Sequence, residues 1–223
     1  MGAEVSNQKT SVYNFLKEKI LNCEFLPGDF LNDKDLIEAY GFGRTPIREA
    51  IILLQSEGFL EVIPRKGTYI KGLDREEVLQ LYELRRTMEP VIASKFITDM
   101  DFPRLLAIDS EMREMCEKGD LRENAKEFYT LDVEFHTALM ESSGNPRMTN
   151  MLKPVFTDVY RYGLYNSIRG TERPRKSTYQ EHHRILQAIL EEDREELVRA
   201  YTMHLNVSLL SSLNSLELQG QGN

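Results

Sequence analysis

The stretch Gly43-Arg44-Thr45-Pro46-Ile47-Arg48-Glu49-Ala50-Ile51 decides how the first part of the 223-residue chain folds. Proline is tolerated only in the first turn of a helix, so Pro46 predicts a helix that begins between Gly43 and Thr45, with one of these two as the capping residue. Arg44 and Arg48 stand four residues apart at the N-terminal end of this helix. Apolar residues recur at helical spacing on another face and predict a buried stripe of Ile47, Ala50, Ile51 and Leu54.

The residues on either side predict a helix-turn-helix followed by a hairpin. Gly41 interrupts the chain before the helix with the two arginines, and Glu57-Gly58 ends that helix. Two cations and a glycine, Arg65, Lys66 and Gly67, fall in the tight turn of the hairpin. The expected elements are a helix over 11–22, a helix over 33–40, the helix from 43–45 to 57, a strand over 59–63, a turn over 64–67 and a strand over 68–70.

This layout places two arginines where a DNA-binding helix reads bases. The N-terminal residues of the second helix of a helix-turn-helix reach base edges in the major groove, and an arginine there can donate two hydrogen bonds to guanine. A hairpin with two cations at its tip can lie against phosphates or the minor groove. The alternative is that Arg44 and Arg48 only solvate a surface helix. DNA binding is favoured because helix, turn, helix and basic hairpin occur together and in order.

The charge balance shows how such a DNA-binding part would have to work. The whole chain has a formal net charge of −8. Residues 1–71 hold nine Lys or Arg and ten Asp or Glu, so they are near neutral and the remainder carries most of the negative charge. DNA binding must therefore depend on a local cluster of cations and on two copies of the chain acting together. The cluster is Lys34, Arg44, Arg48, Arg65 and Lys66.

The rest of the chain reads as helical. Asp74 can cap a helix that has Glu76 and Glu77 in its first turn and runs to about Thr98. From there to Leu218 only helical periods occur, separated by short breaks. We therefore expect a mainly α protein with a winged helix-turn-helix domain over 1–71, made of three helices and a β-hairpin, and an all-α bundle of six or seven helices over 72–223.

Three of the four histidines lie on apolar helix faces of this second domain. Asp132 and His136 are four residues apart and point the same way, and His182 and His204 lie on the apolar stripes of two later helices. Burying such side chains without partners is costly. Each could be satisfied singly, for instance by a hydrogen bond between Asp132 and His136. The set instead favours a metal site, because helical bundles build such sites from inward-facing side chains.

Three imidazoles and one carboxylate suit a divalent metal ion with one or two open coordination positions. Zinc is the first choice, and nickel, manganese and iron are the alternatives. His183 is adjacent to His182 but rotated by about 100° around the helix, so it is expected to face elsewhere.

Several motifs together resemble the winged-helix domain of GntR-family transcription regulators. The resemblance implies that Arg44, Thr45, Arg48 and Gly67 contact DNA, and Lys34 also aligns. The family commonly has Ser or Thr before the first arginine. Here that residue is Gly43, so the helix cap and a phosphate contact should be weaker. The motifs are Pro27-Gly28-Asp29-Phe30-Leu31, Asp35-Leu36, Arg44-Thr45-Pro46-Ile47-Arg48-Glu49-Ala50, Glu57-Gly58-Phe59-Leu60 and Pro64-Arg65-Lys66-Gly67.

The second domain resembles the FCD-type effector domain of the FadR subfamily. The resemblance implies that the aspartate and three histidines bind a divalent metal, and that a small carboxylate, often a sugar acid or hydroxy acid, coordinates it. Arg85 matches a family arginine near the pocket and can pair with such a carboxylate; a salt bridge to Glu89 is the alternative. The motifs are Leu84-Arg85 with Glu89, Asp132-Val133-Glu134-Phe135-His136, Ser143-Gly144-Asn145-Pro146, Glu181-His182 with Ile185-Leu186 and Ala188-Ile189, and Met203-His204-Leu205.

Taken together, these features predict a metabolite-responsive transcription regulator, expected to be a repressor, that binds a pseudo-palindromic operator in double-stranded DNA as a homodimer. A cytoplasmic location is expected, since Cys23 and Cys116 form no disulfide framework and no apolar run approaches a membrane span. One rival is a metal-dependent enzyme acting on a small hydroxy or sugar acid, but it would not explain the basic winged module. Another is a DNA-binding protein with a purely structural metal.

Overall fold

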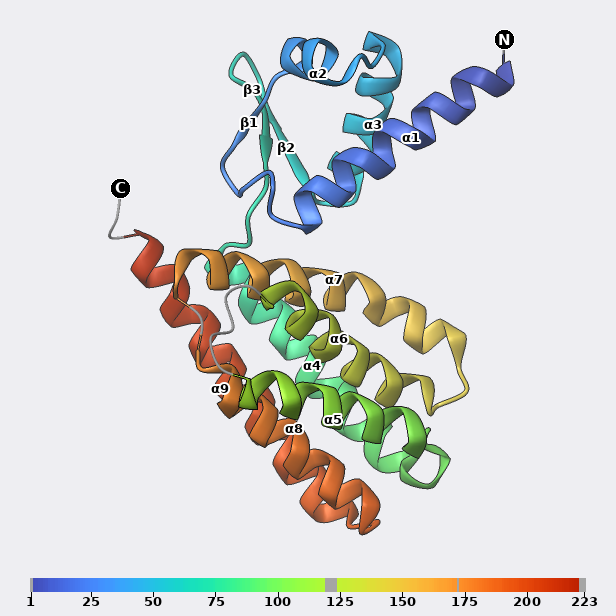
Figure 1. The fold of residues 1–223 in the computed structure, drawn as a ribbon, viewed down its shortest axis with the longest axis vertical. Helices are drawn as coiled ribbons and strands as arrows, with labels where there is room; N and C mark the ends of the chain where they lie inside the picture. Colours follow the sequence, from blue (N-terminus) through green and yellow to red (C-terminus); the bar gives the residue numbers. More distant parts are fainter. Residues whose placement is uncertain (1, 119–123, 172, 221–223) are drawn as a thin grey trace. The chain divides into compact units, whose positions relative to one another are not determined.

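The computed structural model describes residues 2–118, 124–171 and 173–220. The chain divides between Gly72 and Leu73 into an N-terminal unit that holds the strands and an all-helical C-terminal unit. Figure 1 shows both units in the colours of the sequence. None of the described helices is long and apolar enough to cross a membrane.

The N-terminal unit has the three helices and the hairpin that the sequence predicts, and a further short strand. That strand, β1, pairs antiparallel with β3, with Phe30 opposite Tyr69, and completes a sheet of order β1-β3-β2. This strand was not predicted, because two residues are too short for an alternating pattern. The elements are α1 (Gly2–Leu21), β1 (Phe30–Leu31), α2 (Asp33–Tyr40), α3 (Arg44–Ser56), β2 (Leu60–Ile63) and β3 (Gly67–Ile70).

Helix α3 begins where Pro46 requires. Gly43 is its N-cap, in an extended conformation with φ −74° and ψ 153°, and provides no side-chain hydrogen bond to the first turn. Helix α2 is capped better, because the side chain of Asn32 accepts from the backbone N–H of Lys34 at 3.0 Å. The stripe on α3 is buried as expected, and it anchors the helix against α1 so that the opposite face is exposed.

Gly67 is required by the geometry of the hairpin. Its φ is +122°, in a region that side-chain-bearing residues rarely adopt. A Cβ at this position would lie 2.3 Å from Cε2 of Phe30, whose ring packs over the glycine. Gly67 therefore has a structural reason to be glycine, independent of any contact with DNA.

Within its described residues the C-terminal unit has six α-helices, in agreement with the predicted bundle, and one 3₁₀ turn. Asp74 and Glu77 form a capping box at the start of α4. This helix ends at Lys95, before the expected Thr98, and a 3₁₀ turn follows. The elements are α4 (Arg75–Lys95), η1 (Ile97–Asp99), α5 (Phe102–Glu117), α6 (Ala125–Glu141), α7 (Pro146–Arg169), α8 (Arg175–Leu190) and α9 (Arg194–Gly220).

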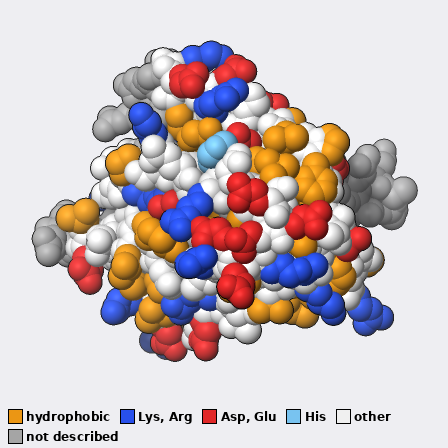
Figure 2. All heavy atoms as spheres, turned by 90° about the horizontal axis from the view of Figure 1, so that it is seen from below, with side chains coloured by type: hydrophobic (Ala, Val, Ile, Leu, Met, Phe, Trp, Pro, Cys, Tyr) orange, Lys and Arg blue, Asp and Glu red, His pale blue; other side chains and the backbone are white. Residues whose placement is uncertain are grey.

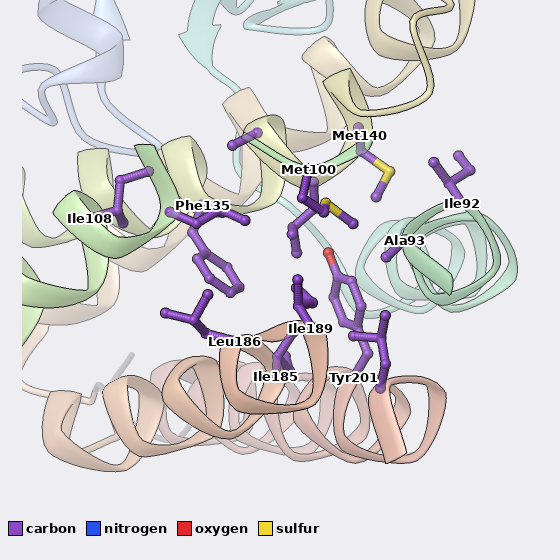
Figure 3. Packing of buried hydrophobic residues seen from close by; sticks show 14 of the residues in the cluster. Ile92, Ala93, Met100, Ile108, Phe135, Met140, Ile185, Leu186, Ile189 and Tyr201 are labelled. Carbon is purple, nitrogen blue, oxygen red and sulfur yellow. The ribbon is translucent and has the colours of Figure 1, made fainter. Parts of the chain in front are cut away.

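One continuous apolar core holds the helices of this unit together. Helix α9 packs along both α4 and α8, and α6 packs along both α7 and α4. Figure 3 shows side chains from several of these helices pointing toward one another, among them Phe135, Leu186, Ile189 and Tyr201. Asp132, His136, His182 and His204 belong to α6, α8 and α9, so the same packing that forms the core brings them together.

One face of the molecule carries charges of both signs. On the face that Figure 2 draws, Lys and Arg side chains are interspersed with Asp and Glu, and apolar side chains lie between them.

Candidate metal centre and DNA-binding surface

The side chains predicted to contact DNA are exposed on the N-terminal unit. Arg44, Thr45 and Arg48 lie on the first two turns of α3, on the face away from the core. The other cations, Lys34 on α2 and Arg65 and Lys66 in the β2–β3 turn, are also exposed, and Gly67 is half-buried under Phe30. With the described residues the five cations make no ion pair, so their charge is available to an anionic partner.

The helical unit brings three of the predicted metal ligands to one point. Nε2 of His204 lies 3.3 Å from Nε2 of His182 and 3.3 Å from Nε2 of His136. All three ring nitrogens lie within 4.8 Å of one another, and all three residues are buried. Side chains of α6, α8 and α9, far apart in sequence, thus meet with the same ring atom pointing inward.

Two of the three imidazoles are held from behind by carboxylates. Nδ1 of His204 lies 2.9 Å from Oε2 of Glu181, and Nδ1 of His136 lies 2.9 Å from Oε2 of Glu89. The hydroxyl of Tyr201 lies 2.8 Å from that same Nδ1 and donates to Glu89. Because an ionised carboxylate only accepts, these contacts place the proton on Nδ1 and leave the Nε2 lone pair facing the cluster.

His182 and Asp132 complete the cluster differently. Nε2 of His182 lies 3.5 Å from Oδ1 of Asp132, while its Nδ1 has no hydrogen-bond partner among the described residues. Asp132 therefore stands at the edge of the cluster, beside one histidine. The pair considered from the sequence, Asp132 with His136, is not what positions His136, since that ring is held by Glu89 and Tyr201.

Burial governs the protonation of the cluster. It lowers the pKa of both His182 and His204 well below the usual value, and the neighbouring imidazoles lower it further. Burial also raises the pKa of Asp132. For Glu89, burial acts to raise the pKa, but the Arg85 guanidinium and His136 together lower it well below its usual range. Neutral imidazoles backed by an ionised carboxylate are the form in which histidines bind metals.

A cavity lies directly beside the cluster. His204, Asp132 and Arg85 line it at the cluster end. From there it follows one face of α9, with Ser208, Ser211 and Ser212, and the start of α4. A second arginine, Arg173, also lines it. The cavity thus combines two cations, hydroxyl groups and apolar walls, a lining that suits a small anionic molecule.

The two arginines of the cavity are not equivalent. Arg85 is buried and pairs with Glu89, with its Nε 2.7 Å from Oε1, and its Nη2 lies 3.1 Å from Nε2 of His136. The salt bridge that the sequence left as an alternative is therefore present, in addition to a place at the cavity. Arg173 lies in the connection before α8 and pairs with Glu181, with Nη2 2.8 Å from Oε2.

Sequence reasoning missed Arg173, because a residue between two helices has no periodic pattern to show which way it points. It also gave no role to Glu181 as a partner of His204 or to Tyr201 as a partner of His136. His183 faces elsewhere as expected: its Nδ1 lies 2.8 Å from Oδ1 of Asp109 on α5, and its side chain is 42% exposed.

The donor set fits a divalent cation. Two nitrogens that bind one tetrahedral zinc at about 2.0–2.1 Å stand roughly 3.3 Å apart, which is the separation found here between neighbouring Nε2 atoms. Inward lone pairs on His136 and His204, each fixed by a carboxylate behind the ring, match the way metal-binding histidines are oriented. Arg85 gives one of these lone pairs another partner, since its Nη2 donates to His136.

Comparisons with known families agree with the two-unit division. Residues 8–70 match the family described as bacterial regulatory proteins, gntR family, and residues 80–207 match the FCD domain. The HTH-type transcriptional regulator YdhC of Bacillus subtilis is 28% identical over 194 residues, which cover 87% of this chain and 86% of YdhC. The HTH-type transcriptional repressor RspR of Escherichia coli is 24% identical over 199 residues, 87% of this chain and 84% of RspR.

The fold also occurs in a solved structure of a GntR transcriptional regulator from Rhodococcus sp. RHA1. That chain superimposes with a TM-score of 0.76 at 19% sequence identity, over 93% of this chain and 98% of the other. At this identity the likeness concerns the fold alone.

Proposed function

The chain belongs to the gntR family of bacterial regulatory proteins and, by its FCD domain, to the FadR subfamily, and we propose that this DNA-binding transcription regulator is controlled by a small carboxylate metabolite bound at a divalent metal ion. The metal, with zinc as first choice, would sit among His136, His182, His204 and Asp132. The observation that carries the proposal is the convergence of three Nε2 atoms beside a cavity that His204, Arg85 and Arg173 line.

The N-terminal unit would provide the contact with DNA. Arg44 and Arg48 at the start of α3 would read base edges in the major groove, with Thr45 beside them, while Lys34, Arg65 and Lys66 would contact phosphates. A single near-neutral unit of this kind offers few charges. Two units related by the two-fold axis of a homodimer would bind both halves of a pseudo-palindromic operator and double the contacts.

The helical unit would provide the sensor. A bound divalent cation supplies a positive, Lewis-acidic centre that a carboxylate can coordinate at an open position. The chain's own groups hold and orient this site: Glu89 and Glu181 keep two imidazoles turned inward, and the cavity arginines offer hydrogen bonds to an acid. Binding of the acid would then alter operator affinity, and operator binding would alter acid affinity by the same factor.

The mode of regulation we propose is repression, as in the relative RspR, which is named a repressor. We also propose a cytoplasmic location, because a bacterial transcription regulator acts on DNA in the cytoplasm. A metal-dependent enzyme is no longer a rival, because the family and the relatives are transcription regulators and not enzymes. A purely structural metal stays as the alternative that the second experiment below addresses.

The first experiment tests DNA recognition. The protein is used to select binding sites from a pool of random duplex DNA, and the affinity for the enriched site is compared between the parent and Arg44→Ala and Arg48→Ala. We expect an enriched pseudo-palindrome and a loss of about 1–3 kcal/mol for each variant. Arg147→Ala is the control, since Arg147 is exposed on α7 of the other unit. Unchanged affinity of both α3 variants would overturn the assignment of α3 as the recognition helix.

The second experiment tests the sensor. Thermal melting of zinc-loaded parent and of His136→Ala is followed against a panel of small carboxylic acids. A ligand that binds only the folded protein raises the melting temperature by mass action. We expect one acid to stabilise the parent and not the variant. If zinc stabilises the parent and no acid adds to this, the metal is structural and the sensor proposal fails.

A further inference from the structure

We propose that Arg173 is the residue that receives the ligand carboxylate in the cavity of the helical unit, and that Glu181 couples this contact to the metal ligand His204. The proposal rests on the metal centre proposed above and goes beyond it, because it names the group that links the acid to the metal.

The first argument is the donor capacity of the two cavity arginines. Arg85 has Nε at 2.7 Å and Nη2 at 3.4 Å from the two oxygens of Glu89, so its fork is engaged by one carboxylate already. Arg173 has a single ion pair, through Nη2, and all three of its guanidinium nitrogens are buried without a well-aligned hydrogen bond within the described part of the chain. Buried donors without partners are costly, and a carboxylate oxygen is the acceptor that satisfies a guanidinium best.

The second argument is that one carboxylate oxygen serves both Arg173 and His204. Oε2 of Glu181 lies 2.8 Å from Nη2 of Arg173 and 2.9 Å from Nδ1 of His204. The opposite ring nitrogen of His204 is the one that faces His136 and His182. A continuous chain of contacts therefore runs from the cavity wall, through Glu181, to the metal-facing atom of one ligand.

The charges fix the direction of the coupling. A carboxylate behind a metal-binding histidine makes the ring a better ligand. Arg173 shares that carboxylate and so weakens its pull on His204, and its own positive charge also opposes a cation in the cluster. An acid that binds Arg173 neutralises this charge and draws the guanidinium from Glu181. Acid and metal should therefore strengthen each other's binding.

The test begins with zinc alone, measured by calorimetric titration of the full chain. Arg173→Gln should bind zinc several-fold more tightly than the parent, whereas Glu181→Gln should bind it about 10- to 100-fold more weakly. Arg184→Gln is the matched control. Arg184 lies on the same helix as Glu181 and pairs with Glu196 at 2.7 Å, but its side chain is 52% exposed. Zinc affinity of Arg173→Gln equal to or weaker than that of the control would overturn the proposal.

The titration is then repeated in acetate, L-lactate and D-gluconate, with chloride at equal ionic strength as the reference. In the parent at least one acid should tighten zinc binding by about fivefold or more. Arg173→Gln should lose this effect, and Arg173→Lys should keep part of it, since lysine retains the charge but not the fork. An acid effect that persists in Arg173→Gln, or no effect of any acid in the parent, would overturn the role of Arg173.

Failure of this inference is distinguishable from failure of the proposed function. If the parent and His136→Ala bind zinc equally, or neither binds it, the metal centre itself is wrong. If zinc binding depends on His136 but Arg173→Gln behaves like Arg184→Gln, the metal centre stands and the inference about Arg173 falls.

Discussion

The two units of this protein handle charge in opposite ways. In the N-terminal unit the cations predicted for DNA binding, among them Arg44 and Arg48, are exposed and make no ion pair with the described residues. In the helical unit the groups of the candidate site are buried or half-buried and engage one another, as in the pairs of Arg85 with Glu89 and Glu181 with His204. An exposed cluster can bind a large polyanion without a change of shape, whereas a buried network responds to a small ligand that changes one partner.

The largest effect that would break this contrast is expected at the metal centre. His136→Ala removes a proposed metal ligand that Glu89 and Tyr201 hold in place, and zinc affinity should fall by more than the roughly 100-fold found when an outer partner is lost. Calorimetric titration measures this. The control is His183→Ala, since His183 pairs with Asp109 outside the cluster and should leave zinc affinity unchanged. Equal affinities for both variants would place the metal elsewhere.

The next effect concerns stability of the N-terminal unit. Gly67→Ala forces a side chain into a φ of +122° and against the ring of Phe30, and should destabilise the unit by about 1–3 kcal/mol. Urea unfolding checks it. The double variant Phe30→Ala with Gly67→Ala should relieve the clash but keep the backbone strain. Its loss of unfolding free energy should therefore be smaller than the sum of the losses of the two single variants. Full additivity would show that the packing of Phe30 on Gly67 carries no energy.

A smaller effect is expected when the pH is lowered, and it concerns the free energy of unfolding of the helical unit. The pKa values of His182 and His204 are lowered when the chain folds, so below about pH 6.5 the unfolded chain takes up protons that the folded metal-free protein does not. Stability is therefore fully present above that pH and falls as the pH drops toward the lowered values. The free energy of unfolding of chelator-treated protein, measured with urea, should decrease less between about pH 8 and pH 5.5 for His182→Asn than for the parent. Equal decreases would contradict the lowered pKa.

The smallest effect is expected from a phosphate contact in the wing. Lys66→Ala should weaken DNA binding about equally for all sequences and reduce the slope of log affinity against log salt by about 1. The measurement is a salt series with the selected operator and with an unrelated duplex. Lys118→Ala, at an exposed position of the helical unit, should change neither slope. Loss of sequence preference in Lys66→Ala would instead make the wing a reader of bases.

The same contrast explains what could be predicted from the sequence. Helix α3 depends on neighbours in the chain: Pro46 fixes its first turn, and Ile47, Ala50 and Leu54 fix its buried face. Patterns of neighbouring residues therefore predicted this helix, and they also predicted that Arg44 and Arg48 are exposed. Strand β1 was not predicted, because it forms only through its pairing with β3 and a strand of two residues has no sequence pattern of its own.

The convergence of the three histidines was predictable in part, because histidines on apolar faces have to find partners inside the core. Which partners they find depends on how α4, α6, α8 and α9 pack, and that packing is set by contacts between residues far apart in sequence. Glu89 and Tyr201 behind His136 became visible only in the structure. The same holds for Arg173, which belongs to a connection without periodicity.

The most direct test of the account is the affinity of the selected operator for zinc-loaded protein, with and without the acid found by thermal melting. The account predicts that the acid changes operator affinity of the parent by about fivefold or more, and that His136→Ala shows no change. An acid that binds the parent at the metal centre and leaves its operator affinity unaltered would contradict the claim that the helical unit controls the DNA-binding unit.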